Sequence, residues 1–553
     1  MKKILMLTFS ILIFILGCQG SYNNVSHKPS VSGDIEDNST WYADMNNNVL
    51  KMSVSIPTPN SSLCAPYNNP NGQKRACTLE DIDHDTNPYD DYNPKLNVRM
   101  STPDFIPANE QTNASLNQKG KSTRDAIQKS YRIKLDSKTE LYEKQRTFQL
   151  NKHAFDNSRI RNKFAFDFFI DIPNFTSLKT QFVHLNIDGK DYGLFTDIEK
   201  EGKEYLINRG WNPNDNLYKA QNFDFRYSPE LALDSSGHPV NLKAFNSKIE
   251  VERGKKQTKL IEMIKAIDEA KTDKEFEQVF NRYFNRNNYI TWLAVNIIFA
   301  NKDTISQNFF LFNPLYSDTF YFTPWDYDDS SHPINTYPKW QLGLSLWWDI
   351  PLHKKFIKIK KNRDDVLKMV KDIRAKYVTD AIIKQRLDTY RPVIEHYVKI
   401  NPDLANIHLD IWEKEYKALY TRIGENVKAF TDNIGSPMPF WQGANYVNGI
   451  LNLTWGRAVD LESDKIVYEV KIADNVNMQN PIIDEQNVQD IPTKKGDNEN
   501  IYYSKDINLS NGKYYMKVIA SEENNTSSYQ IAFDTIQLNL KDYVFGVLEF
   551  EVK

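Results

Sequence analysis

The sequence lacks the signatures of several large functional classes. Lysine and arginine number 69 against 72 aspartate and glutamate, a formal net charge of −3. Without a positive excess, we expect no nucleic-acid partner. The chain has no Gly-x-Ser-x-Gly turn, no His-Glu-x-x-His helix and no Gly-x-x-x-x-Gly-Lys loop. These absences argue against a serine hydrolase of that type, a zinc protease and a P-loop nucleotidase.

Cysteine is scarce, with three in 553 residues, and the first lies near the N-terminus. Lys2 and Lys3 precede an apolar run from Ile4 to Gly17 that ends at Cys18, which is the layout of a signal peptide. As a helix this run would span roughly 21 Å, less than a hydrocarbon core about 30 Å thick. The junction Ile15-Leu16-Gly17-Cys18 resembles the bacterial lipobox, whose cysteine thiol takes a lipid before cleavage.

The N-terminal segment therefore predicts an extracytoplasmic lipoprotein, anchored to a bacterial membrane through Cys18, on the cell surface or the periplasmic face. The alternative is an ordinary signal peptide with an incidental cysteine. No later stretch approaches the eighteen apolar residues of a membrane span, so we expect the remaining chain to be soluble.

The two other cysteines, Cys64 and Cys77, flank a segment rich in Pro and Asn-Gly turn signals. In an oxidising compartment this pattern predicts a disulfide, worth roughly 3 kcal/mol in the chain-entropy model. Two free thiols are the alternative. Zinc is not favoured, because no second pair of Cys or His has ligand spacing.

The chain is 40% hydrophobic and 13% aromatic, which is enough for large packed cores. Composition divides it into five segments: a lipoprotein signal peptide (1–18), a flexible tether (19–50), a loop-rich N-terminal extension (51–95), a mixed helix and sheet domain (96–435) and an all-strand domain (440–553).

Periodicity predicts the elements of the mixed domain. Ser130–Asp136 alternates like a half-buried strand, and Asp188-Gly189 between two apolar runs predicts a hairpin. Residues 257–300 and 355–430 have helical spacing, and the helix before Asn301 is apolar nearly all round. Further predicted elements are a helix at 159–169 and strands at 50–56, 309–312 and 319–322.

The terminal segment changes to a period of two. Leu451–Trp455, Ile466–Ile472 and Lys513–Ile519 alternate apolar and polar residues, with turn-rich gaps between them. This pattern resembles a fibronectin type III domain, in which Trp455 would belong to the core.

A cluster of acidic residues, Asp81-Ile-Asp-His-Asp-Thr-Asn87, copies the start of a calcium loop. It has Thr86 where such a loop needs Gly and Tyr92 where it needs Glu. We interpret it as a solvated acidic loop.

The stretch that predicts chemistry is Asn301-Lys-Asp303-Thr-Ile-Ser-Gln-Asn308, followed by Asp326. Phosphoryl transfer needs a carboxylate near the attacking hydroxyl and oxygen ligands that hold magnesium on the triphosphate. The catalytic loop of protein kinases has its Asp and its metal-binding Asn five positions apart, as Asp303 and Asn308 are. A predicted hairpin then separates Asn308 from Asp326, where kinases have a second metal-binding Asp.

Six stretches in order resemble the CotH family of atypical bacterial protein kinases, first recognised in spore coats. They are Lys121-Ser-Thr-Arg124, Lys129-Ser-Tyr-Arg-Ile-Lys-Leu-Asp136, Arg161-Asn162, Asp191-Tyr-Gly-Leu-Phe195 with Glu199, Asn301-x-Asp303 and Trp325-Asp326-Tyr-Asp328. The resemblance covers about residues 95 to 430. It implies an α+β chain, with an atypical protein-kinase-like fold followed by the all-β sandwich domain.

The resemblance implies a role for each matching residue. Asp303 matches the catalytic Asp, while Asp326 and Asn308 match the metal ligands. The implied cofactors are ATP and Mg²⁺ or Mn²⁺. The alternative to a catalytic or metal-binding role is a structural one, in which each side chain caps a helix, stabilises a loop or lies exposed on the surface.

The residues implied to contact the nucleotide are Lys134, with Arg132 as a neighbour, and Glu199. An ammonium group can neutralise phosphate charge, which favours Lys134 for that role. The sequence departs from the family at Gly120-Lys121-Ser122, where Gly-Asn-Ser is usual near the phosphates.

We therefore predict a surface-anchored CotH-type kinase that transfers the γ-phosphoryl group of ATP to Ser or Thr hydroxyls of a protein acceptor. The alternative is a non-catalytic surface adhesin or binding lipoprotein on the same fold. A surface glycan-binding protein is a third hypothesis, which rests on the aromatic residues and the terminal domain.

The predicted anchor is tested by Cys18→Ser. Without the thiol no lipid can be attached, so we expect the variant to leave the membrane fraction or to remain an uncleaved precursor. Fractionation and immunoblotting measure this, with Cys64→Ser as a cysteine variant that keeps the anchor. Processing and fractionation identical to the parent would contradict the prediction.

Overall fold

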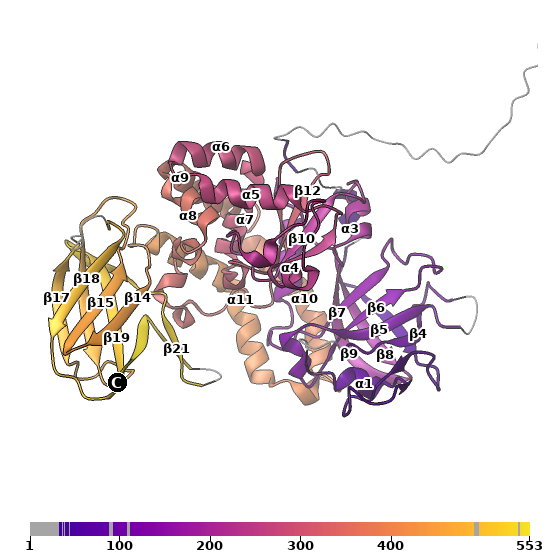
Figure 1. Ribbon diagram of the computed structural model, residues 1–553. Coiled ribbons are helices and arrows are strands. Elements are labelled where there is room, and N and C mark those ends of the chain that lie inside the picture. The colour runs from indigo at the N-terminus through magenta and orange to yellow at the C-terminus, as the bar shows by residue number, and fades with distance from the viewer. Residues whose placement is uncertain are drawn as a thin grey trace, which may run out of the picture.

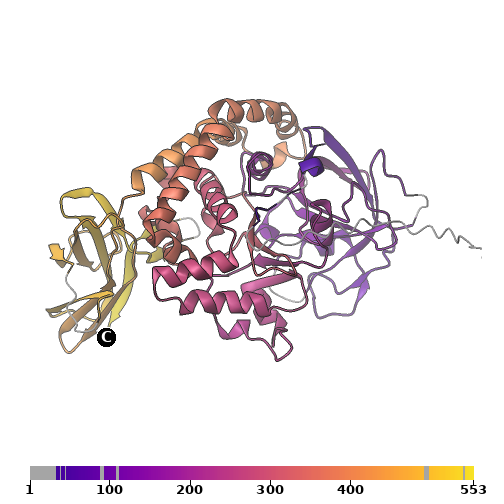
Figure 2. The same ribbon diagram turned by 90° about the horizontal axis from the view of Figure 1, so that it is seen from above.

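The computed structural model describes residues 33–553 except 36, 38, 44, 88–91, 108–110, 491–496 and 540–541. Cys18, the predicted signal peptide and the first part of the predicted tether lie outside the described residues. Figure 1 shows a sheet-rich part, a helical part and a part made of strands, in chain order. Seen from above in Figure 2, the helices lie between the two sheet-rich ends.

The first part is a closed barrel of seven strands in the order β1-β4-β5-β6-β7-β9-β8. Its strands alternate inward apolar and outward polar residues, as β4 does throughout. The strands are β1 (Val49–Ser55), β4 (Leu96–Ser101), β5 (Ala114–Lys119), β6 (Ser130–Leu135), β7 (Thr147–Asn151), β8 (Thr180–Ile187) and β9 (Lys190–Ile198).

The barrel begins earlier in the chain than the sequence predicted. β1 lies across the predicted boundary between tether and extension, and it pairs in parallel with β8, Val49 opposite Phe182. The buried side chains of Trp41 and Tyr42 also pack on the barrel side, where the Tyr42 hydroxyl donates to the Ser177 carbonyl at 2.9 Å. A long-range parallel pairing leaves no local sequence signal, so composition alone set the boundary too late.

The extension between β1 and β4 is held together by a disulfide. The structure joins Cys64 and Cys77 across the pair β2 (Leu63–Cys64) and β3 (Arg75–Ala76), with their Cα atoms 5.3 Å apart. Helix α1 (Leu79–Asp83) follows directly and begins with a capping box.

The aspartates that resembled a calcium loop are bonded within the protein. Asp81 pairs with Arg75 at 2.7 Å and caps α1, and Asp83 accepts the Tyr131 hydroxyl at 2.8 Å. The segment is thus a helix start and its flank, rather than a solvated loop.

The helical part surrounds a four-stranded sheet in the order β11-β10-β12-β13. Helix α7 is buried on every side and packs on β13, α9 and α11. None of the helices among the described residues is long and apolar enough to cross a membrane. The elements are α2 (Arg161–Phe169), α3 (Lys203–Asn208), β10 (Asn216–Ala220), α4 (Leu242–Lys248), β11 (Ile249–Arg253), α5 (Thr258–Glu269), α6 (Asp273–Tyr283), α7 (Arg286–Ile298), β12 (Phe309–Asn313), β13 (Tyr321–Pro324), α8 (Pro351–Lys358), α9 (Lys360–Lys376), α10 (Asp380–Val398) and α11 (Leu409–Asn433).

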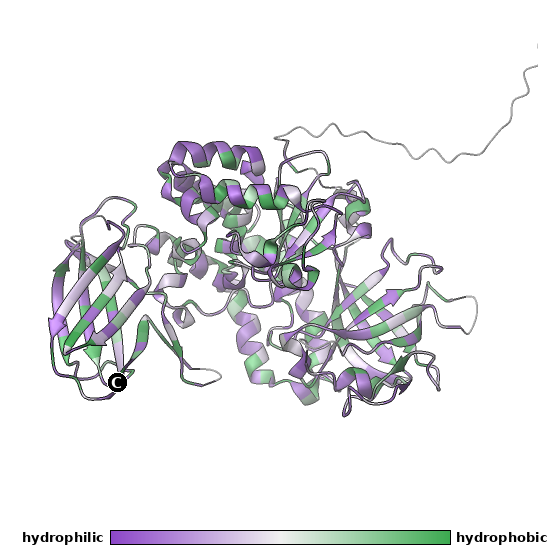
Figure 3. Ribbon diagram, in the orientation of Figure 1, coloured by the Kyte–Doolittle hydropathy of each residue, from purple (hydrophilic) through white to green (hydrophobic). Residues whose placement is uncertain are grey.

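The C-terminal strands form two antiparallel sheets, β14-β15-β18 and β17-β16-β19-β20, with β23 added to β19. Trp455 and Tyr468 lie in the core of this part, and its strands carry green and purple bands in Figure 3. The strands are β14 (Gln442–Val447), β15 (Ile450–Gly456), β16 (Ile466–Ala473), β17 (Ile483–Gln489), β18 (Asn500–Asp506), β19 (Gly512–Glu522), β20 (Asn525–Ile531) and β23 (Val547–Val552), with a separate hairpin of β21 (Thr535–Gln537) and β22 (Tyr543–Phe545).

Residues 440–553 are expected to fold alone, because their apolar side chains form a core separate from that of the helical part. Circular dichroism should show a β-rich spectrum and a single cooperative thermal transition. A shorter fragment that starts at residue 460 lacks β14 and β15, including Trp455, and is the control expected to be unfolded. A disordered spectrum for 440–553 would contradict the predicted boundary.

Candidate active site

The candidate catalytic residues lie at the ends of three neighbouring elements. Asp303 follows α7, Asn308 precedes β12 and Asp326 follows β13. Because β12 and β13 pair with Phe309 opposite Pro324, Asn308 and Asp326 leave adjacent strands at the same edge. The buried side chain of Asn301 then donates to the backbone carbonyl of Asp326 at 3.2 Å and ties the two segments together.

Asn308 and Asp326 both have left-handed backbone, with φ of 55° and 52°. Asn and Asp adopt this conformation more readily than most residues, but it still costs of order 1 kcal/mol. Such strain gathers at functional sites, where the surrounding structure holds it in place. Here it falls on the two residues that the sequence predicted as metal ligands.

The Asp303 carboxylate is fixed by two amides. Gln307 donates to one oxygen at 2.8 Å and Asn308 to the other at 2.9 Å. Burial raises the pKa of Asp303, the charges of Asp329 and Asp326 add to the shift, and the Gln307 bond opposes it. Since the Asn308 nitrogen is used on Asp303, its carbonyl oxygen is the atom it can offer to a cation.

Asp328 is a further acidic residue of the site, two residues after Asp326 in the Trp325-Asp326-Tyr-Asp328 stretch. Burial raises its pKa well above the usual range, and the charge of Asp326 and a hydrogen bond to it add to the shift. Two adjacent carboxylates and an amide oxygen are the donors that Mg²⁺ and Mn²⁺ prefer. Asp326, Asp328 and Asn308 therefore fit a divalent cation.

Lys119, at the end of β5, donates to the side-chain oxygen of Asn151 on β7 and lies near Trp325, the residue before Asp326. Burial lowers its pKa to about 8, while the charges of Asp326 and Asp328 oppose the shift. Its ammonium lies 5.5 Å from the centre of the Trp325 ring, and that of Lys219 on β10 lies 4.8 Å from the same ring. Two cations thus gather next to the acidic group.

The two residues of β6 that were predicted to lie near the nucleotide phosphates differ in their surroundings. Arg132 contributes to the electrostatic environment of Lys119, and its buried Nε has no hydrogen-bond partner. Lys134 lies two residues after Arg132 on the same face of β6. Its side chain is exposed, and its neighbours on the adjacent strands are Ser115 and Thr147. Lys119 could have been found from its place on the outward face of the neighbouring strand, just before a glycine.

The Glu199 carboxylate, predicted to lie near the nucleotide, already has hydrogen-bond partners within the protein. It is buried and accepts two bonds from the Arg209 guanidinium, at 2.9 and 2.8 Å, and one from the Trp41 indole at 3.2 Å. Two residues later, Glu201 is 1% exposed and neither of its carboxylate oxygens has a hydrogen-bond partner. Burial raises the pKa of Glu201 to about 8, opposed by the charges of Lys200 and Lys219.

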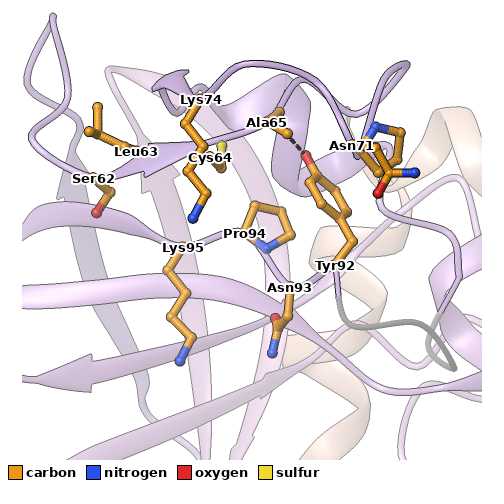
Figure 4. A pocket seen from close by; sticks show the side chains of 11 residues that line it. Ser62, Leu63, Cys64, Ala65, Asn71, Lys74, Tyr92, Asn93, Pro94 and Lys95 are labelled. Carbon is orange, nitrogen blue, oxygen red and sulfur yellow. Dashed lines mark hydrogen bonds between the residues drawn. The ribbon is translucent and has the colours of Figure 1, made fainter.

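Two other features of the surface hold none of these residues. A hollow of about 760 Å³ lies beside the disulfide, and Figure 4 shows Lys74 and Lys95 on its wall. None of its described lining residues is acidic. Among the described residues, the one close triple of acidic ligand atoms is in the C-terminal part, at Asp460, Asp464 and Glu522.

The family model for the CotH kinase protein matches residues 116–429, which is more than half of the chain. This chain belongs to the CotH family. The match begins within β5 and ends within α11, so it contains every catalytic, metal and nucleotide candidate that the sequence named. The predicted resemblance to CotH is thereby confirmed over residues 116–429.

Two individual proteins are also similar to this CotH chain. Inner spore coat protein H of Bacillus subtilis (strain 168) is 25% identical over 211 residues, 38% of this chain and 56% of the relative. The chain thus spans about half the length of the curated relative it matches. A structure of the Shewanella oneidensis MR-1 toxin–antitoxin system HipA, HipB and its operator DNA is 13% identical, covering 62% of this chain and 65% of that one. Its TM-score of 0.24 is too low to carry an argument.

Divalent cations are expected to bind this CotH protein more tightly as pH rises, because protons and cations compete for Asp328. A raised carboxyl pKa means stability that is present at low pH and lost as pH rises through that pKa, so the cation should restore it at high pH. Thermal unfolding with and without Mn²⁺ measures this, with a larger shift near pH 8 than near pH 5.5.

Asp328→Asn should abolish the pH dependence of the Mn²⁺ shift. Asp318→Asn is the matched control, because Asp318 lies between β12 and β13, where its carboxylate pairs with Arg282. A shift of equal size at both pH values in the parent would contradict the assignment.

Proposed function

We propose that this protein is a CotH-type protein kinase that transfers the γ-phosphoryl group of ATP to Ser or Thr hydroxyls of an acceptor protein. The observation that carries the proposal is the arrangement of Asp303, Asn308 and Asp326 at one edge of the β12–β13 pair. Family membership over residues 116–429 supports it.

In this proposal Asp303 orients the acceptor hydroxyl and takes its proton as the new O–P bond forms and the bond to ADP breaks. Gln307 and Asn308 hold the carboxylate in one orientation. A raised pKa makes Asp303 a stronger base than an exposed aspartate, which suits proton acceptance.

The remaining residues of the site would bind the nucleotide. Asp326, Asp328 and Asn308 would hold Mg²⁺ or Mn²⁺, which neutralises phosphate charge when bound. Lys119 takes the phosphate-contacting role predicted for Lys134, because its ammonium group lies near the ring of Trp325, the residue before Asp326. Arg132 keeps its predicted role as a residue that lies near the nucleotide, next to the lysine that contacts the phosphates.

The proposal extends to the location and the accessory domain. The lipobox-like sequence at Cys18 supports an extracytoplasmic, lipid-anchored enzyme with a protein acceptor at the same surface. The paired strands of residues 440–553 and the buried Trp455 support a fibronectin type III-like sandwich.

The kinase proposal is tested with Asp303→Asn and Asp326→Asn. Asp303→Asn should keep ATP binding and lower phosphoryl transfer by roughly 10²–10⁴-fold, the contribution of a positioned acid–base group. Asp326→Asn should weaken metal-dependent ATP binding as well as transfer. Calorimetric titration with ATP and Mg²⁺ or Mn²⁺, alongside transfer of labelled phosphate, measures both quantities.

Lys119→Met and Lys134→Met form a matched pair of controls on neighbouring strands. The first should weaken ATP binding and the second should leave it unchanged. A parent protein that binds no nucleotide with either cation would overturn the kinase proposal and favour an adhesin. Binding without transfer to itself or to any acceptor would make the protein a pseudokinase.

A further inference from the structure

The turn that leaves β5 has a conformation that requires glycine. Gly120 has φ of 101°, and a Cβ atom there would lie 2.0 Å from the Thr123 hydroxyl. The short helix η2 (Ser122–Asp125) follows at once. Since Lys119 immediately precedes Gly120 and its ammonium lies 5.5 Å from the ring of Trp325, the residue before Asp326, this turn borders the candidate active site.

Arg124 stabilises the turn through two hydrogen bonds to its backbone carbonyls. Its Nε donates to the Gly120 carbonyl at 3.0 Å, and its own backbone N–H donates to the Lys121 carbonyl at 3.2 Å. The side chain is nearly buried, so the orientation of its guanidinium depends on a partner that compensates the charge. That partner is Asp85, whose carboxylate accepts from Nη1 and is 2% exposed.

Asp85 belongs to the disulfide-linked extension rather than to the segment matched by the family model, which begins at residue 116. It follows α1, and the carbonyls of Ile82 and Asp85 both face the side-chain amide of Gln118 on β5, at 3.0 and 2.7 Å. The extension therefore contacts the end of β5 through Gln118 and the following turn through Arg124.

We propose that Asp85 is a positioning residue for nucleotide binding, which acts through Arg124 to fix the Gly120 turn where it meets the phosphates. The inference rests on the proposed kinase function. Without the Asp85 carboxylate, the Arg124 guanidinium loses the ion pair that fixes its orientation, and with it the geometry of its bond to the Gly120 carbonyl. The turn then loses the anchor that places Lys119 and the backbone N–H groups after it.

The test is Asp85→Asn in the full chain, titrated calorimetrically with ATP and with adenosine in the presence of Mg²⁺. ATP binding should weaken by at least about tenfold, as when one partner of a buried charge pair is removed. Adenosine binding should not change, because adenosine has no phosphate for the turn to contact. Hydrogen exchange of residues 119–126 should increase.

Asp83→Asn is the matched control, because Asp83 lies two residues before Asp85, at the end of α1, and bonds to Tyr131 instead of Arg124. Arg124→Lys is a second variant that keeps the charge near Asp85, and a single ammonium group cannot reproduce the guanidinium bonds to both Asp85 and Gly120. It should show the same ATP-selective loss even if Asp85→Asn fails to fold.

Unchanged ATP affinity in a folded Asp85→Asn or Arg124→Lys variant would overturn the inference. An equal loss for ATP and adenosine would also overturn it, since that result indicates a general structural role. A parent that binds no ATP would overturn the kinase proposal itself, and the inference with it. The parent titration therefore separates the two failures.

Discussion

The pairing of β12 with β13 is the constraint on which the candidate site depends. Its register sets Phe309 opposite Pro324, so that Asn308 and Asp326 emerge side by side although they are far apart in the chain. Helix α7 lies against β13 and is buried on every side, which fixes the start of the segment that carries Asp303. The hydrophobic core thus positions three polar residues that contribute little to it.

The charged side chains inside this site are arranged differently from those outside it. Several buried charges outside the site are paired; for example, Arg161 at the start of α2 bonds to Glu415 on α11 at 2.9 Å. At the site two carboxyl groups are adjacent, and burial, together with neighbouring Asp326, raises the pKa of Asp328. Two neighbouring carboxylates repel one another, so an arrangement of this kind favours a cation between them.

Local sequence patterns were sufficient for much of the fold and for the acidic part of the site. The strand at 130–136, the hairpin around Asp188-Gly189 and the buried helix before Asn301 all appear where periodicity predicts them. The proximity of Asp303, Asn308 and Asp326 could be predicted from the sequence, because the first two are five residues apart and a short hairpin links Asn308 to Asp326. These features depend on side chains close in the chain, so a single sequence contains their signal.

Tertiary structure alone decided which similar residues face the site. Lys119 and Lys134 both occupy outward positions of the neighbouring strands β5 and β6, and the ammonium group of Lys119 lies near the ring of Trp325, the residue before Asp326. Glu199 and Glu201 differ because Arg209 bonds the first and leaves the second unpaired. The sequence determined the elements and the local spacing of catalytic groups. Long-range pairing determined which charges meet, because electrostatic contact depends on distance in space and not along the chain.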